Sequence, residues 1–94
     1  MPAPREHHLK CVHEFFVDVW MGNKPFELRK DDRGFSVGDV LVLHETGIKP
    51  DRPPRWIKAQ ISYLLGGGPW LAPGYVALGM NVFERGGHEP PKQS

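Results

Sequence analysis

The chain has a single cysteine, Cys11, so no disulfide can form within it. No segment approaches the roughly 18 consecutive apolar residues of a transmembrane helix, and residues 1–10, MPAPREHHLK, lack the apolar centre of a secretion signal. A lone cysteine is typical of proteins that work in a reducing compartment. We therefore expect a cytoplasmic protein with no membrane association.

The chain also lacks a strong excess of charge of either sign. Its 12 Lys and Arg residues against 11 Asp and Glu residues give a formal net charge of +1. A protein that holds a nucleic-acid backbone through a general electrostatic field needs a large positive excess. The composition therefore excludes broad, charge-driven binding, and any contact with RNA or DNA must come from a local patch or pocket.

A complete zinc-binding pattern is missing. The segment HHLKCVH contains four side chains that can ligate zinc: His7, His8, Cys11 and His13. A closed zinc site needs four ligands with reliable pairing, and no second cluster follows this one. We expect no bound metal and no other cofactor, and we interpret Cys11 as a small buried hydrophobe.

A phosphate-binding loop is missing as well. The segment GGGPW is rich in glycine, but it lacks the Gly-Lys-Ser/Thr ending and the following helix of such a loop. Glycine and proline together are the usual residues of turns. Trp70 and Tyr75, at the ends of this loop, can still offer a stacking surface to a base.

The length of 94 residues indicates one small domain, since domains commonly hold about 100 to 150 residues. A content of 39% hydrophobic and 24% charged residues is typical of a folded protein. Proline, glycine and polar residues predict flexible tails at 1–6 and 86–94, around a domain at 7–85. So small a core favours a compact barrel, or a sheet with one or two helices, over a layered α/β enzyme.

One helix is expected near the start, at about 13–21. Four apolar side chains recur there at helical spacing and are expected in the core: Phe15, Phe16, Val19 and Trp20. Gly22 follows them and suits the position just after the end of a helix.

About five strands are expected, in the segments HHLKCV, PFELRK, FSVGDVLVLHE, WIKAQISYLL and YVALGMNVFE. The third segment is apolar on both faces, as expected of a central strand, and Gly38 and Asp39 are expected to begin it with a turn or bulge. The segment at 46–55 contains three prolines, which predicts an exposed irregular loop. These elements indicate an α+β chain whose strands close into a small mixed barrel.

The segment GNKPFELRK places three charged side chains close together. Glu27 and Arg29 point the same way on a strand, about 7 Å apart, and the preceding turn can aim Lys24 at the same place. In a cavity, this group can bind a phosphate or the polar edge of a base, and it can also polarise water and stabilise an oxyanion. On the surface, these side chains would form an ion pair that adds little to stability. Spacing alone favours the surface arrangement.

The order of the elements and one set of residues resemble the ASCH family of the PUA-like superfamily. The pattern is that of a small phage and bacterial branch of unknown function, H-x-L-K…FF…G-x-K-x-x-E-x-R-K…F-x-V-G-D. In this chain it is met by His8 (or His7), Leu9, Lys10, Phe15, Phe16, Gly22, Lys24, Glu27, Arg29, Lys30, Phe35, Val37, Gly38 and Asp39. The match covers about residues 7–84.

The resemblance implies a PUA-like mixed β-barrel with a cleft between the helix and the sheet, lined by the charged residues of the pattern. It also implies action on RNA or on modified nucleotides, with Arg29 both contacting the ligand and holding Glu27. The ligand-binding residues expected on this basis are Lys24, Glu27, Arg29, Lys30, Trp70 and Tyr75.

Three functions remain open at this point. The leading one is an RNA- or modified-nucleotide-binding domain. The alternative is a small hydrolase of acylated cytidine or RNA with Lys24 and Glu27 as catalytic residues. It is suggested by an ASCH branch similar to cytidine deacylases, in which a threonine stands in place of Glu27 and a later insertion supplies a glutamate. The third is a phage accessory protein that contacts a protein partner through loop 50–54 and the Trp56 region.

Overall fold

The computed structural model describes residues 3–48 and 52–87. Residues 1–2 and 88–94, which make up much of the two predicted tails, and 49–51 of the proline-rich loop lie outside the described residues. The described chain forms one helix and five strands: β1 (Glu6–Val12), α1 (His13–Trp20), β2 (Phe26–Lys30), β3 (Val40–Thr46), β4 (Trp56–Gly66) and β5 (Tyr75–Gly86). The prediction of an α+β chain with one N-terminal helix and about five strands is confirmed.

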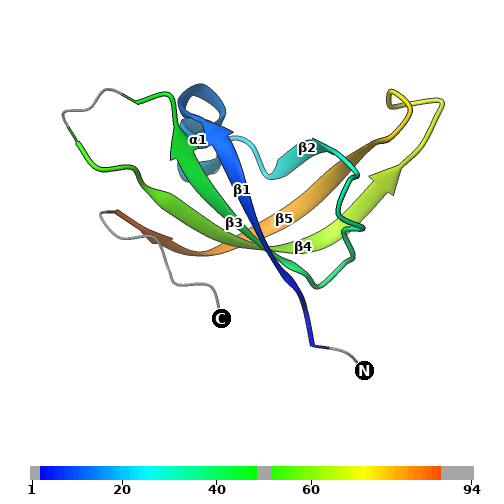
Figure 1. Cartoon of the computed structure of the whole chain (residues 1–94), viewed down its shortest axis with the longest axis horizontal. Helices are drawn as coiled ribbons and strands as arrows, with labels where there is room; N and C mark the ends of the chain where they lie inside the picture. Colours follow the sequence, from blue (N-terminus) through cyan, green and yellow to red (C-terminus); the bar gives the residue numbers. More distant parts are fainter. Residues whose placement is uncertain (1–2, 49–51, 88–94) are drawn as a thin grey trace.

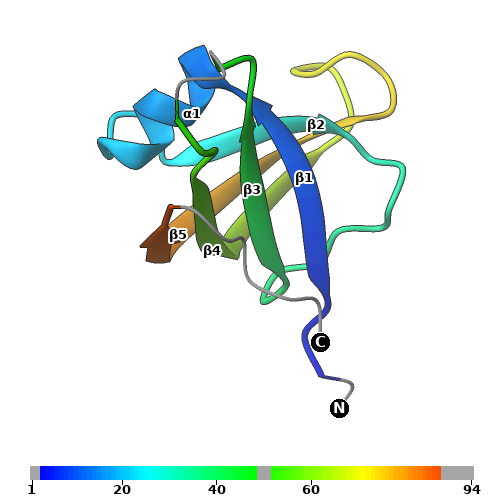
Figure 2. The ribbon, with the colours of Figure 1, turned by 60° about the vertical axis from the view of Figure 1, so that its left-hand side comes forward.

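The strands form one mixed sheet in the order β1-β3-β4-β5-β2. β1 runs parallel to β3, and the other neighbours are antiparallel. The sheet curls into a half-barrel, with α1 at one end of it (Figures 1 and 2). Among the described strand pairings no ladder joins β1 to β2, so the expected barrel is open at the seam between these two edge strands.

The helix ends at its predicted glycine. The Met21 N–H donates to the Val17 carbonyl at 2.9 Å, and the Gly22 N–H donates to the Val19 carbonyl at 3.1 Å. Gly22 has a φ of +83°, a conformation that is accessible to glycine because it has no Cβ. Gly22 therefore ends α1 and turns the chain toward β2.

Three of the four apolar side chains of α1 point into the core, as predicted. Phe16 and Val19 are buried, and Trp20 packs against the core from a partly buried position. Phe15 is half exposed, which corrects its assignment to the core. A helix of only eight residues presents one stripe to the sheet, and Phe15 lies beside that stripe.

The core fills the inside of the curl. It consists of Leu9, Cys11, Phe16, Val19, Phe35, Leu41, Leu43, Ile57, Ala59, Ile61, Val76, Leu78 and Met80. Cys11 is buried among these residues, so its interpretation as a small buried hydrophobe is confirmed. Burying one large aliphatic or aromatic side chain contributes about 1.5 to 3 kcal/mol, so this cluster is the main source of stability.

β2 turns its polar face inward. Glu27 is 3% exposed, whereas Phe26 and Leu28 are 45% and 52% exposed. The cause is the pairing with β5, which sets Glu27 opposite the inward-facing Leu78. Alternation in a strand shows that its two faces differ, but the register decides which face meets the core.

The turn expected before β3 is present and is held by a carboxylate. Gly38 has a φ of +96°. Asp39 is buried, and its carboxylate accepts hydrogen bonds from the backbone N–H of Arg5 and of Ser36, each at 3.1 Å. His7 Nε2 lies 2.9 Å from the same carboxylate. Asp39 therefore fastens the first residues of β1 to the start of β3.

A second buried carboxylate, Glu45 of β3, lies among cations with its side chain fully buried. It accepts hydrogen bonds from Arg52 at 2.8 and 2.9 Å and from the Arg55 side chain at 3.0 and 3.2 Å, and His13 Nδ1 lies 2.7 Å away. Burial alone raises the pKa of Glu45, but these hydrogen bonds outweigh it and hold the pKa well below its usual 4.5. The cluster joins β3, the start of α1 and the segment before β4.

We expect Glu45→Gln to lower the free energy of unfolding by about 1.5 to 3 kcal/mol at neutral pH, because two partly exposed arginines lose charge-assisted hydrogen bonds to a buried carboxylate. The folded-state pKa of Glu45 is depressed, so its stabilisation is complete above pH 4.5 and is lost as the pH falls toward that pKa. Urea unfolding at neutral and acidic pH measures both effects. The exposed Glu84→Gln is the control, and an unchanged acid dependence in Glu45→Gln would contradict the assignment.

Candidate functional site

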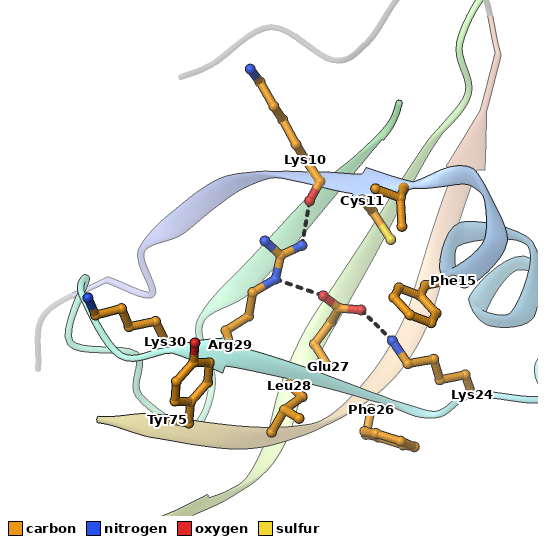
Figure 3. A pocket seen from close by; sticks show the side chains of 11 residues that line it. Lys10, Cys11, Phe15, Lys24, Phe26, Glu27, Leu28, Arg29, Lys30 and Tyr75 are labelled. Atoms are coloured by element: carbon orange, nitrogen blue, oxygen red, sulfur yellow. Dashed lines mark hydrogen bonds and ion pairs between the residues drawn. The ribbon is translucent and has the colours of Figure 1, made fainter. Parts of the chain in front are cut away.

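A cavity of about 580 Å³ lies at the seam between β1 and β2, beside α1. Its lining residues are Lys10, Cys11, Val12, Phe15, Lys24, Phe26, Glu27, Leu28, Arg29, Lys30 and Tyr75 (Figure 3). Five of the six predicted ligand-binding residues are among them. The three charged side chains singled out from the spacing of GNKPFELRK therefore meet in one cavity.

Those three side chains form a chain of hydrogen bonds, here called the Lys24–Glu27–Arg29 triad. Glu27 Oε1 accepts from Lys24 Nζ at 3.1 Å, and Oε2 accepts from Arg29 Nε at 2.9 Å. Arg29 Nη2 also donates to the backbone carbonyl of Lys10 at 2.5 Å (Figure 3). Arg29 therefore bridges β2 and β1 across the open seam of the sheet.

The turn between α1 and β2 sets the position of Lys24. The backbone N–H groups of Asn23 and Lys24 both donate to the Asp18 carbonyl, at 2.9 and 3.1 Å, and Met80 donates to the Pro25 carbonyl at 3.1 Å. These bonds fix the segment to α1 on one side and to β5 on the other. The ammonium of Lys24 is thus held where it reaches the carboxylate of Glu27.

Two aromatic rings flank the same ammonium. Lys24 Nζ lies 4.7 Å from the centroid of the Phe15 ring and 5.4 Å from that of Phe26. A cation over an aromatic face at these distances is attracted by the ring's electrons. The exposed position of Phe15 on α1 is therefore explained by its place in the wall of the cavity rather than in the core.

The triad carries one more positive than negative charge. The Glu27 side chain is almost completely buried, whereas those of Lys24 and Arg29 are partly exposed toward the cavity. Lys10 and Lys30 in the lining add to the positive charge. An unpaired buried carboxylate is costly. Each cation therefore neutralises part of the Glu27 charge, and Glu27 in turn holds each cation in place. The arrangement suits an anionic or hydrogen-bond-accepting ligand.

Cys11 lies in the same wall, one residue after the Lys10 carbonyl that Arg29 contacts. Burial, and then the negative charge of Glu27, raise the pKa of the thiol from 9.0 to about 11. A thiol must ionise to act as a nucleophile. The thiol of Cys11 is therefore neutral at physiological pH, and Cys11 forms part of the cavity wall.

Trp70 and Trp56 lie elsewhere. Trp70 is 77% exposed in the loop between β4 and β5 and is not part of the cavity lining, unlike Tyr75 at the other end of that loop. Trp56 was expected in a surface that contacts a protein partner. It is only 8% exposed, so it offers little area to a partner. Arg52 to Arg55 are irregular, as predicted for that loop, and residues 50–51 lie outside the described residues.

Some lining residues carried no functional signal of their own in the sequence. Lys10, Val12 and Phe15 reach the cavity only because β1 pairs in parallel with β3 and leads directly into α1. That contact is between distant segments, and local spacing does not reveal it. Lys10 and Phe15 do belong to the residue pattern of the resemblance, which is the one signal that could have marked them.

The four possible zinc ligands near the start of the chain separate in space. His7 contacts Asp39, His13 contacts Glu45, and His8 Nδ1 lies 2.8 Å from His44 Nε2. Within residues 3–48 and 52–87, no three His, Cys, Asp or Glu side chains are grouped to hold a metal ion. The helix of the described chain is also too short to cross a membrane.

Comparison with known proteins finds a matching family and a partly similar phage protein. A family model described as "Domain of unknown function (DUF3850)" matches residues 6–80. Over 39 residues the chain is 44% identical to an uncharacterized 12.9 kDa protein in the GpA 3′ region of Escherichia phage P2. That match covers 42% of this chain and 36% of the phage protein, so it spans little more than a third of that relative. The resemblance is confirmed as far as a family of unknown function and a partial match to an uncharacterized phage protein.

Removal of the Glu27 charge is expected to lower the pKa of Cys11 from about 11 toward 9.0, because that charge raises it and the neighbouring Lys24 and Arg29 lower it. Glu27→Gln keeps the shape of the side chain. The Cβ chemical shift of Cys11 in an isotope-labelled sample, followed against pH, reports the change, and Glu84→Gln is the control. A thiol that titrates as before in Glu27→Gln would contradict the proximity of these groups.

Proposed function

We propose a nucleotide-binding function for this chain, which belongs to the DUF3850 family of domains of unknown function. In this proposal the chain is a PUA-like domain of the ASCH type, and its cavity holds one nucleotide of RNA or one modified nucleotide. The observation that carries the proposal is the convergence of Lys24, Glu27 and Arg29 in one cavity.

The two cations keep donors for a ligand. An ammonium has three N–H groups and a guanidinium has five. Among the described residues, Lys24 Nζ has one hydrogen-bond partner, Glu27, and Arg29 Nη1 has none. Since Glu27 already holds both side chains, little conformational freedom is lost when a phosphate or a base oxygen binds them.

The dimensions and walls of the cavity also suit a nucleotide. Its volume of about 580 Å³ falls within the roughly 300 to 1,000 Å³ of small-molecule sites. Phe15, Val12 and Tyr75 supply apolar and aromatic surface for a base, while the triad supplies polar contacts. A pocket for one nucleotide needs no large positive field, which agrees with the net charge of +1.

The hydrogen bonds of Glu27 favour binding over hydrolysis. A general base needs an oxygen within reach of the proton that it removes, and both oxygens of Glu27 already accept hydrogen bonds from cations. Cys11 is no nucleophile while its pKa is about 11. The hydrolase with Lys24 and Glu27 as catalytic residues is therefore the second candidate, and it is distinguished from binding by turnover.

We expect Lys24→Ala and Arg29→Ala each to weaken nucleotide binding about tenfold or more, since a hydrogen bond to a charged group contributes about 1.5 to 3 kcal/mol. Amide chemical shifts in NMR titrations with cytidine and adenosine nucleotides, modified and unmodified, measure the affinity. Lys58→Ala and Arg33→Ala remove the same charges away from the cavity and serve as matched controls. Shifts are expected at residues 10–12 and 22–30.

Unchanged affinity in both cavity variants, or no shifts with any nucleotide, would overturn the proposal. Each sample is followed for hours, so that signals from a product also become visible. Product formation that is abolished by Lys24→Ala and by Glu27→Gln, with the fold intact, would make the protein a hydrolase instead.

A further inference from the structure

The outer face of the sheet carries a set of exposed apolar side chains next to the cavity. Residues directly opposite each other on neighbouring strands point to the same face. Phe26, Gly79 and Tyr63 form one such row, Leu28, Ala77 and Leu65 form the next, and Lys30 and Tyr75 form the third. The outer apolar face is defined here as Phe26, Leu28, Tyr63, Leu65 and Tyr75, all of which are exposed.

This face has no role in the core. The opposite side of the same three strands supplies the core residues Val76 and Leu78, and Leu64 packs against them. Tyr63 is 65% exposed, and the other members of the outer apolar face are between about one-third and one-half exposed. Contiguous apolar surface on a small protein commonly marks a binding site.

The outer apolar face continues into the cavity around one edge strand. Phe26, Leu28 and Tyr75 line the cavity as well as belonging to this face. Figure 3 shows Glu27 on the side of β2 that faces β1, and Phe26 and Leu28 on the other side. Since β2 pairs only with β5 among the described strands, a ligand that fills the cavity can extend past its free edge.

The chemistry of this surface favours a single strand of nucleic acid over an apolar protein segment. Three of its five side chains are aromatic, and bases stack on aromatic rings whatever their sequence. Two cations lie at its border: Lys24 is 5.4 Å from the Phe26 ring centroid, and Lys30 lies opposite Tyr75. Gly79 lies between Tyr63 and Phe26 in their row, so no side chain separates their two rings. In a single strand of nucleic acid, bases alternate with phosphates along the chain. The aromatic rings suit the bases, and the neighbouring cations suit the phosphates.

We propose that the outer apolar face stacks the bases of nucleotides adjacent to the one held in the cavity. The ligand is then a short single strand of RNA that bends around the edge of β2, rather than a free nucleotide. This inference rests on the proposed function and adds to it the length of the ligand and the path that it follows. The rows are about 7 Å apart along the strands, so the surface has room for more than one base.

The test compares cytidine monophosphate with a tetracytidylate RNA. We expect the tetranucleotide to bind at least about fivefold more tightly, because stacking of one base on an aromatic ring contributes about fivefold or more in affinity. Tyr63→Ala is expected to remove that gain and to leave the affinity for the mononucleotide unchanged, since Tyr63 is outside the cavity. Phe83→Ala removes a comparably exposed ring that is not part of the outer apolar face, and it is the matched control.

A tetranucleotide with abasic sugars at the three flanking positions separates stacking from charge, and it is expected to bind like the mononucleotide. Equal affinities of the intact tetranucleotide and the mononucleotide would overturn the inference and leave the proposed function standing. Abasic RNA that binds as tightly as intact RNA would also overturn it. Failure of every ligand to bind would overturn both. If light scattering shows a dimer that dissociates in the Tyr63→Ala variant, the outer apolar face binds a second copy of the chain instead, and the inference is overturned.

Discussion

The seam between β1 and β2 depends on one buried charge. The sheet joins its other neighbours by backbone ladders, but among the described pairings none spans this seam. Glu27 lies there almost without solvent, where an unpaired carboxylate would cost several kcal/mol. The cations that compensate it do structural work as well: Arg29 reaches the Lys10 carbonyl on the opposite strand, and Lys24 comes from the turn after α1. The same contacts that hold the half-barrel together thus build the cavity.

Two buried carboxylates together explain how so short a helix is stable. An isolated helix of eight residues is not stable in water. At its start, His13 contacts Glu45 of β3, and just beyond its end Lys24 contacts Glu27 of β2. Apolar packing of Phe16 and Val19 holds the middle of α1 against the sheet. The helix is therefore fixed at both ends by contacts with buried carboxylates of the sheet.

Local patterns in the sequence predicted local structure well, and contacts between distant segments poorly. The end of α1 at Gly22 and the turn before β3 follow from the conformational freedom of glycine. The inward direction of Glu27 does not follow from alternation, because it depends on the register between β2 and β5. Spacing alone favoured a surface position for the triad, and only the curl of the sheet turns it into a cavity wall. Cys11 and Lys10 join that wall through the β1–β3 pairing, which no nearby residue signals.

In the proposed function, the triad gives a chain of small net charge a way to discriminate in favour of an anion. A field from many scattered cations attracts any polyanion and weakens with salt. Here Lys24 and Arg29 are fixed by Glu27, so their remaining donors have defined directions within a partly enclosed space. Fixed donors select by geometry, because a ligand that cannot match them leaves partly buried groups unpaired. Glu27 is thus consistent with an anionic ligand in the cavity. Its carboxylate orients Lys24 and Arg29, and the net charge of the three side chains stays positive.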